Sequence, residues 1–242
     1  MSRYLLFQLY APLASWGAAA VGEVRHTDVI PTRSALLGLL AAALGISREQ
    51  EARLNQFNQH YCFAVLPLSS REQWLRDYHT TQVPKENRKR SYVTRRDELT
   101  MAPEEVGTLL SVREYRCDAY YLIAVEATAG APETLDALAL ALNAPDFPLY
   151  LGRKACPLAL PLAPKIVEGN LAEAFRQGEK SLEQDLALLF AQPAPEVMCY
   201  WEGEQEGVEL LGAQQRSDRP LSRRRWQFGL RVQHSGKYRR EA

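Results

Sequence analysis

The chain has 242 residues and 46% of them are apolar, enough to build a real core in one large domain, with or without an appendage. Its 29 Lys and Arg residues balance 29 Asp and Glu residues, so the overall charge argues against a nonspecific nucleic-acid binder. The longest apolar stretch, residues 35–44, is too short to cross a bilayer, and the N-terminus lacks the pattern of a secretory signal. We therefore expect a cytoplasmic protein without membrane contact.

The charges are distributed unevenly along the chain. Residues 71–96 hold eight Lys or Arg against three acids, and residues 216–240 hold nine against one. Between them, residues 168–209 hold ten acids against two bases. This asymmetry predicts a basic face for nucleic acid, and the acidic stretch is most simply a solvated surface.

The cysteines are widely spaced and form no CxxC pair, so we expect four small buried hydrophobes in a reducing compartment. They are Cys62, Cys117, Cys156 and Cys199. The chain also has no HxxxH motif, no Cys/His metal spacing and no run of carboxylates suited to magnesium. No metal and no cofactor are expected.

The first half of the chain predicts a strand, two helices and a second strand. Thr32 caps the first helix and Gly45 ends it, and a capping box at residues 47–50 opens the second. The predicted ranges are 3–10, 33–44, 48–58 and 61–68.

A polar, basic excursion at residues 71–111 follows, and its composition suggests an inserted β-hairpin. A long strand at 113–127 then returns to the core, and Pro132 opens a helix at 132–143. After an apolar run that ends at Pro164, we expect two short helices and an irregular C-terminal part with short strands. The helices are predicted at 170–177 and 181–191. The order βαββαβ predicts an α+β, ferredoxin-like fold with helices on one face of an antiparallel sheet.

Two segments have the composition of phosphate-binding sites. Arg33 and Ser34 lie in the first turn of a helix, where backbone N–H groups are free and the helix dipole is positive. Gly152 precedes Arg153 and Lys154 in a loop whose backbone a phosphate can approach. The alternatives are an ordinary helix cap with its arginine over the sheet edge, and a simple turn with solvated charges.

The excursion combines cations with aromatic rings, as single-stranded RNA binding requires. Its candidates are Tyr78, His79, Lys85, Arg88, Lys89, Arg90 and Tyr92. The alternative is a solvated charged surface.

Three further positions are candidates for RNA contact. Trp16 can stack on an unpaired base if it is exposed, although tryptophan is more often buried in a core. Arg113 and Arg116 lie on opposite faces of the returning strand, and solvation at a sheet edge is their alternative. The tail at residues 222–228, SRRRWQF, can contact RNA, a neighbouring subunit or the chain's own acidic stretch.

Five blocks of sequence together are similar to one known family. They are APLASWG (11–17), PTRSALLGLLAAALGI (31–46), LRDYHT (75–80), REYRCDAYY (113–121) and YLGRKACPL (150–158). These blocks resemble the CasD-type subunits of type I-E CRISPR Cascade complexes, which belong to the RAMP superfamily. The blocks follow the family's order up to about residue 160, and residues 165–242 match weakly.

The resemblance implies a ferredoxin-like (RRM-like) RAMP core at residues 1–70 and 112–242, with a glycine-rich loop and an inserted thumb at 71–111. It implies a subunit of an antiviral ribonucleoprotein complex that binds the 5′ handle of the mature CRISPR RNA. Such a subunit caps the filament of backbone subunits, contacts the large subunit, and meets target DNA only through the complex. The resemblance also favours RNA contact at Arg33 and at the glycine loop.

In type I-E systems a different subunit cuts the precursor RNA, so the resemblance implies a binder without catalytic residues. The alternative is a metal-independent endoribonuclease, which needs a general base, a general acid and a cation. Tyr78, His79 and Lys85 form the only local group of this composition.

Overall fold

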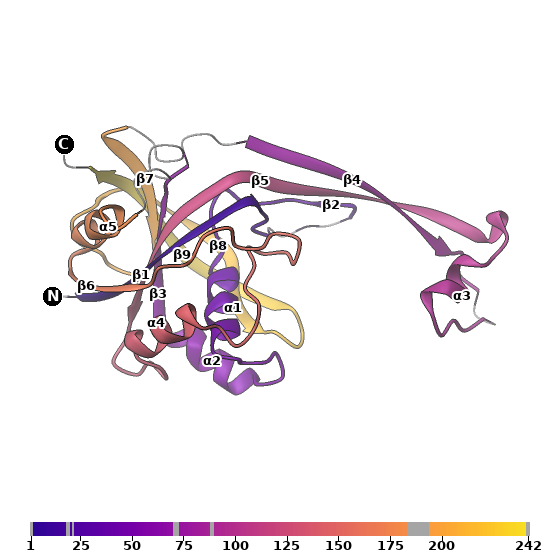
Figure 1. The fold of residues 1–242 in the computed structure, drawn as a ribbon, viewed down its shortest axis with the longest axis horizontal. Helices are drawn as coiled ribbons and strands as arrows, with labels where there is room; N and C mark the ends of the chain where they lie inside the picture. The colour runs from indigo at the N-terminus through magenta and orange to yellow at the C-terminus, as the bar shows by residue number, and fades with distance from the viewer. Residues whose placement is uncertain are drawn as a thin grey trace.

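The computed structural model describes residues 2–17, 20, 22–69, 73–87, 90–182 and 194–240. One sheet organises the chain, and helices pack on both of its faces (Figure 1). The strands are β1 (Ser2–Ala14), β2 (Val24–Arg25), β3 (Tyr61–Pro67), β4 (Gln73–Pro84), β5 (Val106–Ala127), β6 (Lys165–Gly169), β7 (Glu196–Trp201), β8 (Glu209–Ser222) and β9 (Gln227–Arg239). The helices are α1 (Arg33–Ala43), α2 (Glu51–His60), α3 (Arg95–Leu99), α4 (Leu135–Asn143) and α5 (Leu171–Glu179), with a 3₁₀ turn η1 (Pro103–Glu105).

The core of the sheet has ferredoxin-like topology. The order β6-β1-β5-β3, with every neighbouring pair antiparallel, places the fourth core strand beside the first and the third beside the second. This is the strand order that βαββαβ predicts, and the expected α+β fold class is confirmed. The expectation that all helices lie on one face is wrong, because α5 packs on the face opposite to α1 and α4.

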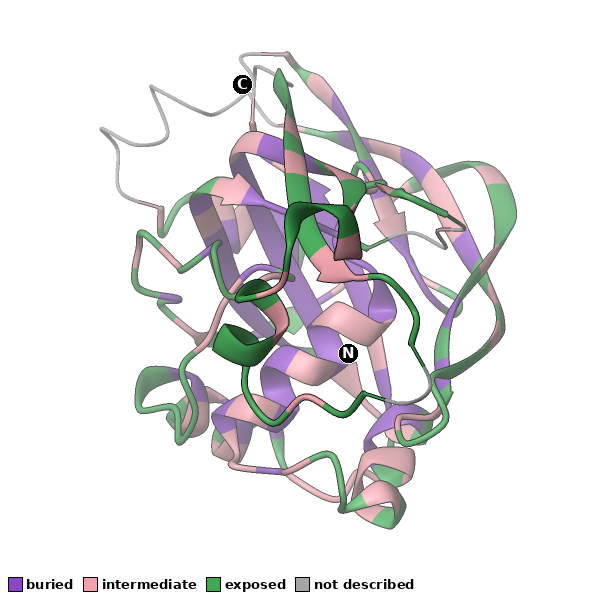
Figure 2. Ribbon diagram, turned by 90° about the vertical axis from the view of Figure 1, so that its right-hand side faces the viewer, coloured by how far each residue is buried: buried purple, intermediate pink, exposed green. Residues whose placement is uncertain are grey.

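Alternation along β1 divides the apolar residues between two cores. Leu5, Phe7 and Leu9 join the core that contains α1 and α4, whereas Tyr4 and Leu6 join the core beneath α5. Figure 2 shows the buried residues concentrated on the sheet and the helix in front of it. Among the described residues, no helix combines the length and the apolar character needed to span a bilayer.

A two-stranded ribbon projects from this core and forms the thumb (Figure 1). β4 pairs with the first half of β5 from Gln73 opposite Cys117 to Pro84 opposite Val106, and α3 and η1 lie at the far end. The pairing extends beyond the expected limit at residue 111 because β5 runs without interruption from the tip of the thumb into the sheet. The base of the thumb is therefore rigidly joined to the core.

Several element boundaries differ from expectation. α2 starts at Glu51 because Gln50 Oε1 accepts from the Ser47 N–H and no side chain caps the helix. α4 starts at Leu135 because Thr134 is its cap. The run before Pro164 is not a strand, and residues 183–191 of the second expected short helix lie outside the described residues.

The C-terminal part is more regular than the sequence suggested. β7 pairs with β3, and β9 and β8 continue the same sheet outward. All four cysteines are free thiols, two buried and two half-buried. Burial raises the pKa of each thiol, that of Cys199 to about 12, so these groups remain protonated at neutral pH.

Candidate nucleic-acid interface

The N-terminus of α1 is not available to an external phosphate. The Thr32 hydroxyl caps the helix by accepting from the Ala35 N–H, as expected. The Arg33 N–H donates to Asp218 Oδ2 at 2.9 Å, so a carboxylate of β8 already occupies this position. Ser34 is half-buried, and its hydroxyl lies 3.2 Å from that of Thr32. The predicted phosphate site at this helix is therefore wrong.

The Arg33 guanidinium is also used inside the protein. It is buried, donates to the carbonyl oxygens of Asn58 and Tyr61 at 2.6 and 2.9 Å, and pairs with Glu202. The expected RNA contact of Arg33 is wrong because its donors point into the core. Glu202, from the stretch expected to be solvated, is buried as well.

Arg231 completes this buried ionic network. Its Nε and Nη2 donate to the two oxygens of Asp218 at 2.6 and 2.8 Å, and its Nη1 lies 3.2 Å from Glu202 Oε1. Burial alone would raise the pKa of Asp218, but the hydrogen bonds and charge of Arg231 outweigh it and lower that pKa. The network ties α1 to β8 and β9.

The glycine loop, residues 150–158, packs against the base of the thumb. Gly152 has φ +86°, and a Cβ on it would lie 1.7 Å from the Ser15 carbonyl oxygen, so no other residue fits. Arg153 donates to the carbonyls of Glu114 and Arg25 at 3.1 and 3.2 Å and covers the Tyr115 ring. Gly152 and Lys154 remain exposed, so they stay candidates for RNA contact, while Arg153 mainly holds segments of the protein together.

Trp16 belongs to the core. It is 1% exposed, its Nε1–H donates to the Tyr121 hydroxyl at 3.1 Å, and the two rings meet edge to face. The prediction that Trp16 stacks on a base is wrong because its ring is enclosed.

One face of the thumb presents an aromatic–cation–aromatic series at its base. Trp74, Arg76 and Tyr78 alternate along β4 and therefore share a face; we name them the β4 stripe. Their exposed fractions are 51%, 70% (side chain) and 61%. Trp74 and Arg76 were not among the predicted RNA contacts, although a two-residue period running back from Tyr78 indicates both.

Two buried residues of β5 support the stripe from below. The Arg116 guanidinium lies 4.6 Å from the centre of the Trp74 ring, and Arg76 Nη2 donates to Glu114 Oε1 at 2.9 Å. The expected direct contact of Arg116 with RNA is wrong because Arg116 is buried. Its guanidinium instead packs on the Trp74 ring. Glu114 also lies 3.1 Å from His26 Nδ1.

Glu114 is an ionised anchor. Burial favours its neutral form, but hydrogen bonds from His26 and Arg76 outweigh burial and lower its pKa below the usual range. At neutral pH this carboxylate therefore holds Arg76 in a fixed position while most of the guanidinium stays accessible.

The suggested nuclease group does not converge. Tyr78 and His79 are adjacent in a strand and so point to opposite faces of the ribbon. His79 pairs with Asp77 on its own face. Lys85 follows His79 by six residues of extended chain, roughly 20 Å away. Among the described residues, no group of three or more His, Cys, Asp or Glu side chains is arranged to hold a metal ion.

The cations nearer the tip are partly neutralised. Arg90 Nη1 lies 2.9 Å from Glu105 Oε1, and the Tyr92 hydroxyl donates to Met101 Sδ at 3.1 Å. Lys85 is exposed, whereas Arg88 and Lys89 lie outside the described residues. Arg113 is exposed near the base, opposite Arg25 of β2.

Comparisons with known proteins agree with this architecture. The model of the family described as "CRISPR-associated protein (Cas_Cas5)" matches residues 4–232. The Cascade subunit CasD of Escherichia coli K12 is 36% identical over 169 residues, which are 67% of this chain and 70% of that protein.

Two solved structures share the fold. A chain of a CRISPR RNA-guided surveillance complex has a TM-score of 0.64 at 23% identity, covering 98% of this chain and 90% of that one. A structure described as a Cas protein has a TM-score of 0.59 at 23% identity, covering 98% and 95%. The chain belongs to the CRISPR-associated Cas5 family, and the resemblance to CasD-type proteins seen in the sequence is confirmed.

Proposed function

We propose that this chain is the Cascade subunit that binds the 5′ handle of the mature CRISPR RNA in the cytoplasm. In this proposal it caps the filament of backbone subunits, contacts the large subunit and meets target DNA only through the complex. Membership of a Cascade complex is supported by the name of the CasD relative, a subunit of such a complex, and by the family match along nearly the whole chain.

The observation that carries RNA binding is the exposed β4 stripe. Its two aromatic rings provide faces for unpaired bases, and Arg76 between them provides a fixed cation for the phosphate that joins the bases. Arg113, on the opposite face of the ribbon, and Lys154, next to the Arg153 that contacts Glu114, add exposed cations near the base of the thumb. Support by Arg116 and Glu114 keeps the stripe ordered before RNA arrives, which lowers the entropic cost of binding.

A double variant of the stripe tests this proposal. We expect Trp74→Ala with Tyr78→Ala to weaken binding of handle RNA by about 2 kcal/mol or more, since stacking contributes roughly 1–3 kcal/mol per base. The measurement is fluorescence anisotropy with labelled handle RNA, using the full chain and the assembled complex. Phe147→Ala, which removes an exposed ring elsewhere, is the control and should bind as wild type does. Unchanged affinity of the double variant would remove the stripe from the RNA site.

We propose further that the chain holds RNA without cleaving it. The separation of Tyr78 from His79 on opposite faces of β4 supports this view. Incubation of the purified chain with repeat RNA in EDTA should leave the RNA intact. A discrete product that disappears in His79→Ala would instead establish the endoribonuclease.

A further inference from the structure

A second group of arginines lies at the outer end of the β8–β9 hairpin. The turn between these strands, residues 223–226, packs against α1 and α2. A Cβ built on Gly38 of α1 would lie 3.6 Å from Arg223 Nη2, so the Arg223 side chain lies along that helix. Arg48, just before α2, approaches the same turn, and its guanidinium lies 5.5 Å from the centre of the Trp226 ring. We name Arg48, Arg223, Arg224 and Arg225 the hairpin arginines.

The residues that the structure describes form no ion pair with these four arginines. Two arginines farther along the same hairpin behave differently, because Arg216 pairs with Asp28 and Arg231 pairs with Asp218. The four arginines outnumber the nearby carboxylates of Glu49 and Glu51, and an excess of like charge destabilises a protein, so this arrangement favours an external anion.

Aromatic rings lie beside the hairpin arginines. Trp226 is 58% exposed, with the Arg223 guanidinium 5.1 Å from its centre, and it stacks with the partly exposed Phe228. Trp226 has φ +51°, a conformation that costs a bulky residue roughly 1 kcal/mol or more. The contacts of the ring with Arg48, Arg223 and Phe228 offset this cost and hold it at the surface.

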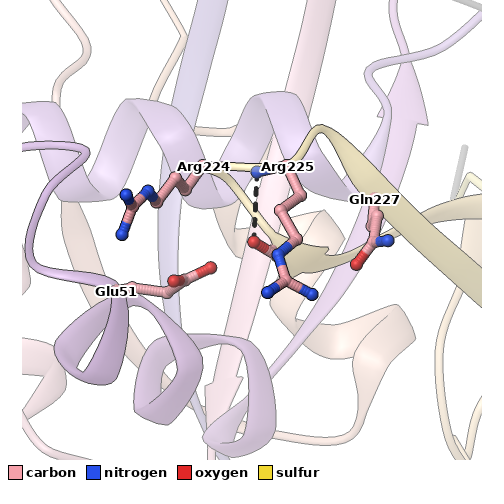
Figure 3. A pocket seen from close by; sticks show the side chains of 5 residues that line it. Glu51, Arg224, Arg225 and Gln227 are labelled. Atoms are coloured by element: carbon pink, nitrogen blue, oxygen red, sulfur yellow. Dashed lines mark hydrogen bonds between the residues drawn. The ribbon is translucent and has the colours of Figure 1, made fainter.

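A hollow of about 460 Å³ opens between this turn and the start of α2. Its lining residues are Glu51, Ser222, Arg224, Arg225 and Gln227. Figure 3 shows the carboxylate of Glu51 and the guanidinium of Arg225 pointing toward the same space, with the Arg225 N–H bound to Ser222 Oγ at 3.2 Å. Glu51 Oε1 is enclosed and has no hydrogen-bond partner among the described residues.

We propose that this hollow binds phosphodiester groups of single-stranded nucleic acid, as a second contact separate from the β4 stripe. Arg224 and Arg225 provide paired donors for phosphate oxygens, and the amide of Gln227 provides another. Nucleic acid fits better than an acidic protein segment, because the exposed rings of Trp226 and Phe228 offer stacking surfaces that carboxylate side chains do not need. The proposal goes beyond the proposed function, because it assigns a site away from the thumb.

The test is the salt dependence of binding to two oligonucleotides of equal length, oligo-U and oligo-dT, by the full chain. Arg224→Ala with Arg225→Ala should lower the slope of log K against log salt by about 1.4, since each lost single-strand phosphate contact removes roughly 0.7. Lys165→Ala with Lys180→Ala removes the same charge from the region of β6 and α5 and should keep the wild-type slope. A lower slope of the arginine variant with both oligonucleotides indicates a site for the phosphate common to RNA and DNA. A lower slope with oligo-U alone indicates that the site binds the guide strand.

Glu51→Gln provides an independent variant with the opposite sign. It removes the carboxylate that faces the hollow, so binding should become several-fold tighter, whereas a merely structural role of Glu51 would leave affinity unchanged.

Three results would overturn the proposal: a wild-type chain that binds neither oligonucleotide, an unchanged slope in the arginine variant, or an equal loss in the lysine control. Weaker binding of polyglutamate by the arginine variant, with unchanged oligonucleotide binding, would identify a protein-docking site instead. If only the Trp74→Ala, Tyr78→Ala variant binds RNA more weakly, the proposed function is supported and the proposed site in the hollow is wrong.

Discussion

Arg33 illustrates how tertiary contacts decide the role of a single side chain. Its position at the start of α1 suggested a phosphate site, and the cap on Thr32 was predicted correctly from local sequence. Glu202, which pairs with its guanidinium, and Asp218, which accepts from its backbone N–H, lie 169 and 185 residues away along the chain. Short-range patterns contain no information on such partners, so the arginine was assigned to the surface.

Asp218 should control acid stability. Asp218→Asn leaves Arg231 without its bidentate partner, and breaking a buried pair costs about 3 kcal/mol. The folded pKa of Asp218 is lowered, so its contribution is complete above about pH 4, the ordinary aspartate range, and is lost as the pH falls through the folded pKa. In urea unfolding at several pH values, the gap between wild type and variant should be constant near neutrality and shrink below about pH 4. Glu209→Gln, which breaks an exposed pair, is the control; a gap independent of pH would contradict this role.

Gly152 should be irreplaceable for backbone reasons. Gly152→Ala forces a Cβ against the Ser15 carbonyl at a positive φ, which should cost at least about 2 kcal/mol of unfolding free energy. Gly17→Ala is a matched comparison, because no described residue other than its chain neighbours lies within 4 Å of a Cβ there. Denaturant titration of both variants makes the measurement, and equal losses would show that the close approach at Gly152 is unimportant.

At the level of elements, the sequence predicted the core well and the C-terminal part poorly. The apolar runs of β1, β3 and the second half of β5 are nearly continuous because both faces of these strands are buried, so their types were predicted correctly. β8 is largely exposed, so its sequence follows no clear apolar period from which the strand could be predicted. The strand is held mainly by its backbone pairing with β9 across a short turn.

The outer thumb should be separable from both the fold and the stripe. Replacing residues 81–109 by Asn-Gly joins Thr80 to Leu110, which are paired, through a two-residue turn. Because the removed residues are mostly exposed, the unfolding free energy should change by less than about 1 kcal/mol. Handle RNA affinity should remain within several-fold of wild type, because the β4 stripe is kept. Fluorescence anisotropy measures the affinity and urea titration measures the free energy of unfolding. If the shortened chain no longer binds handle RNA, the RNA site lies at the tip of the thumb.

For the molecule as a whole, a net charge of zero hides two separate basic regions. One lies at the thumb and the other at the hairpin arginines. Acids such as Asp218 and Glu202 are paired with arginines in the buried network. The charge runs in the sequence predicted both regions. They did not reveal which cations are buried, paired or accessible, since that depends on partners supplied by the fold.

In the proposed function, the β4 stripe binds the 5′ end of the guide RNA. Ultraviolet crosslinking of the affinity-purified complex, followed by peptide mass spectrometry and RNA sequencing, tests it directly. We expect crosslinks from the peptide containing Trp74 and Tyr78 to the 5′-terminal nucleotides of an uncut guide. Crosslinks from that peptide to another part of the guide, or a complex that assembles on its guide without this chain, would contradict it.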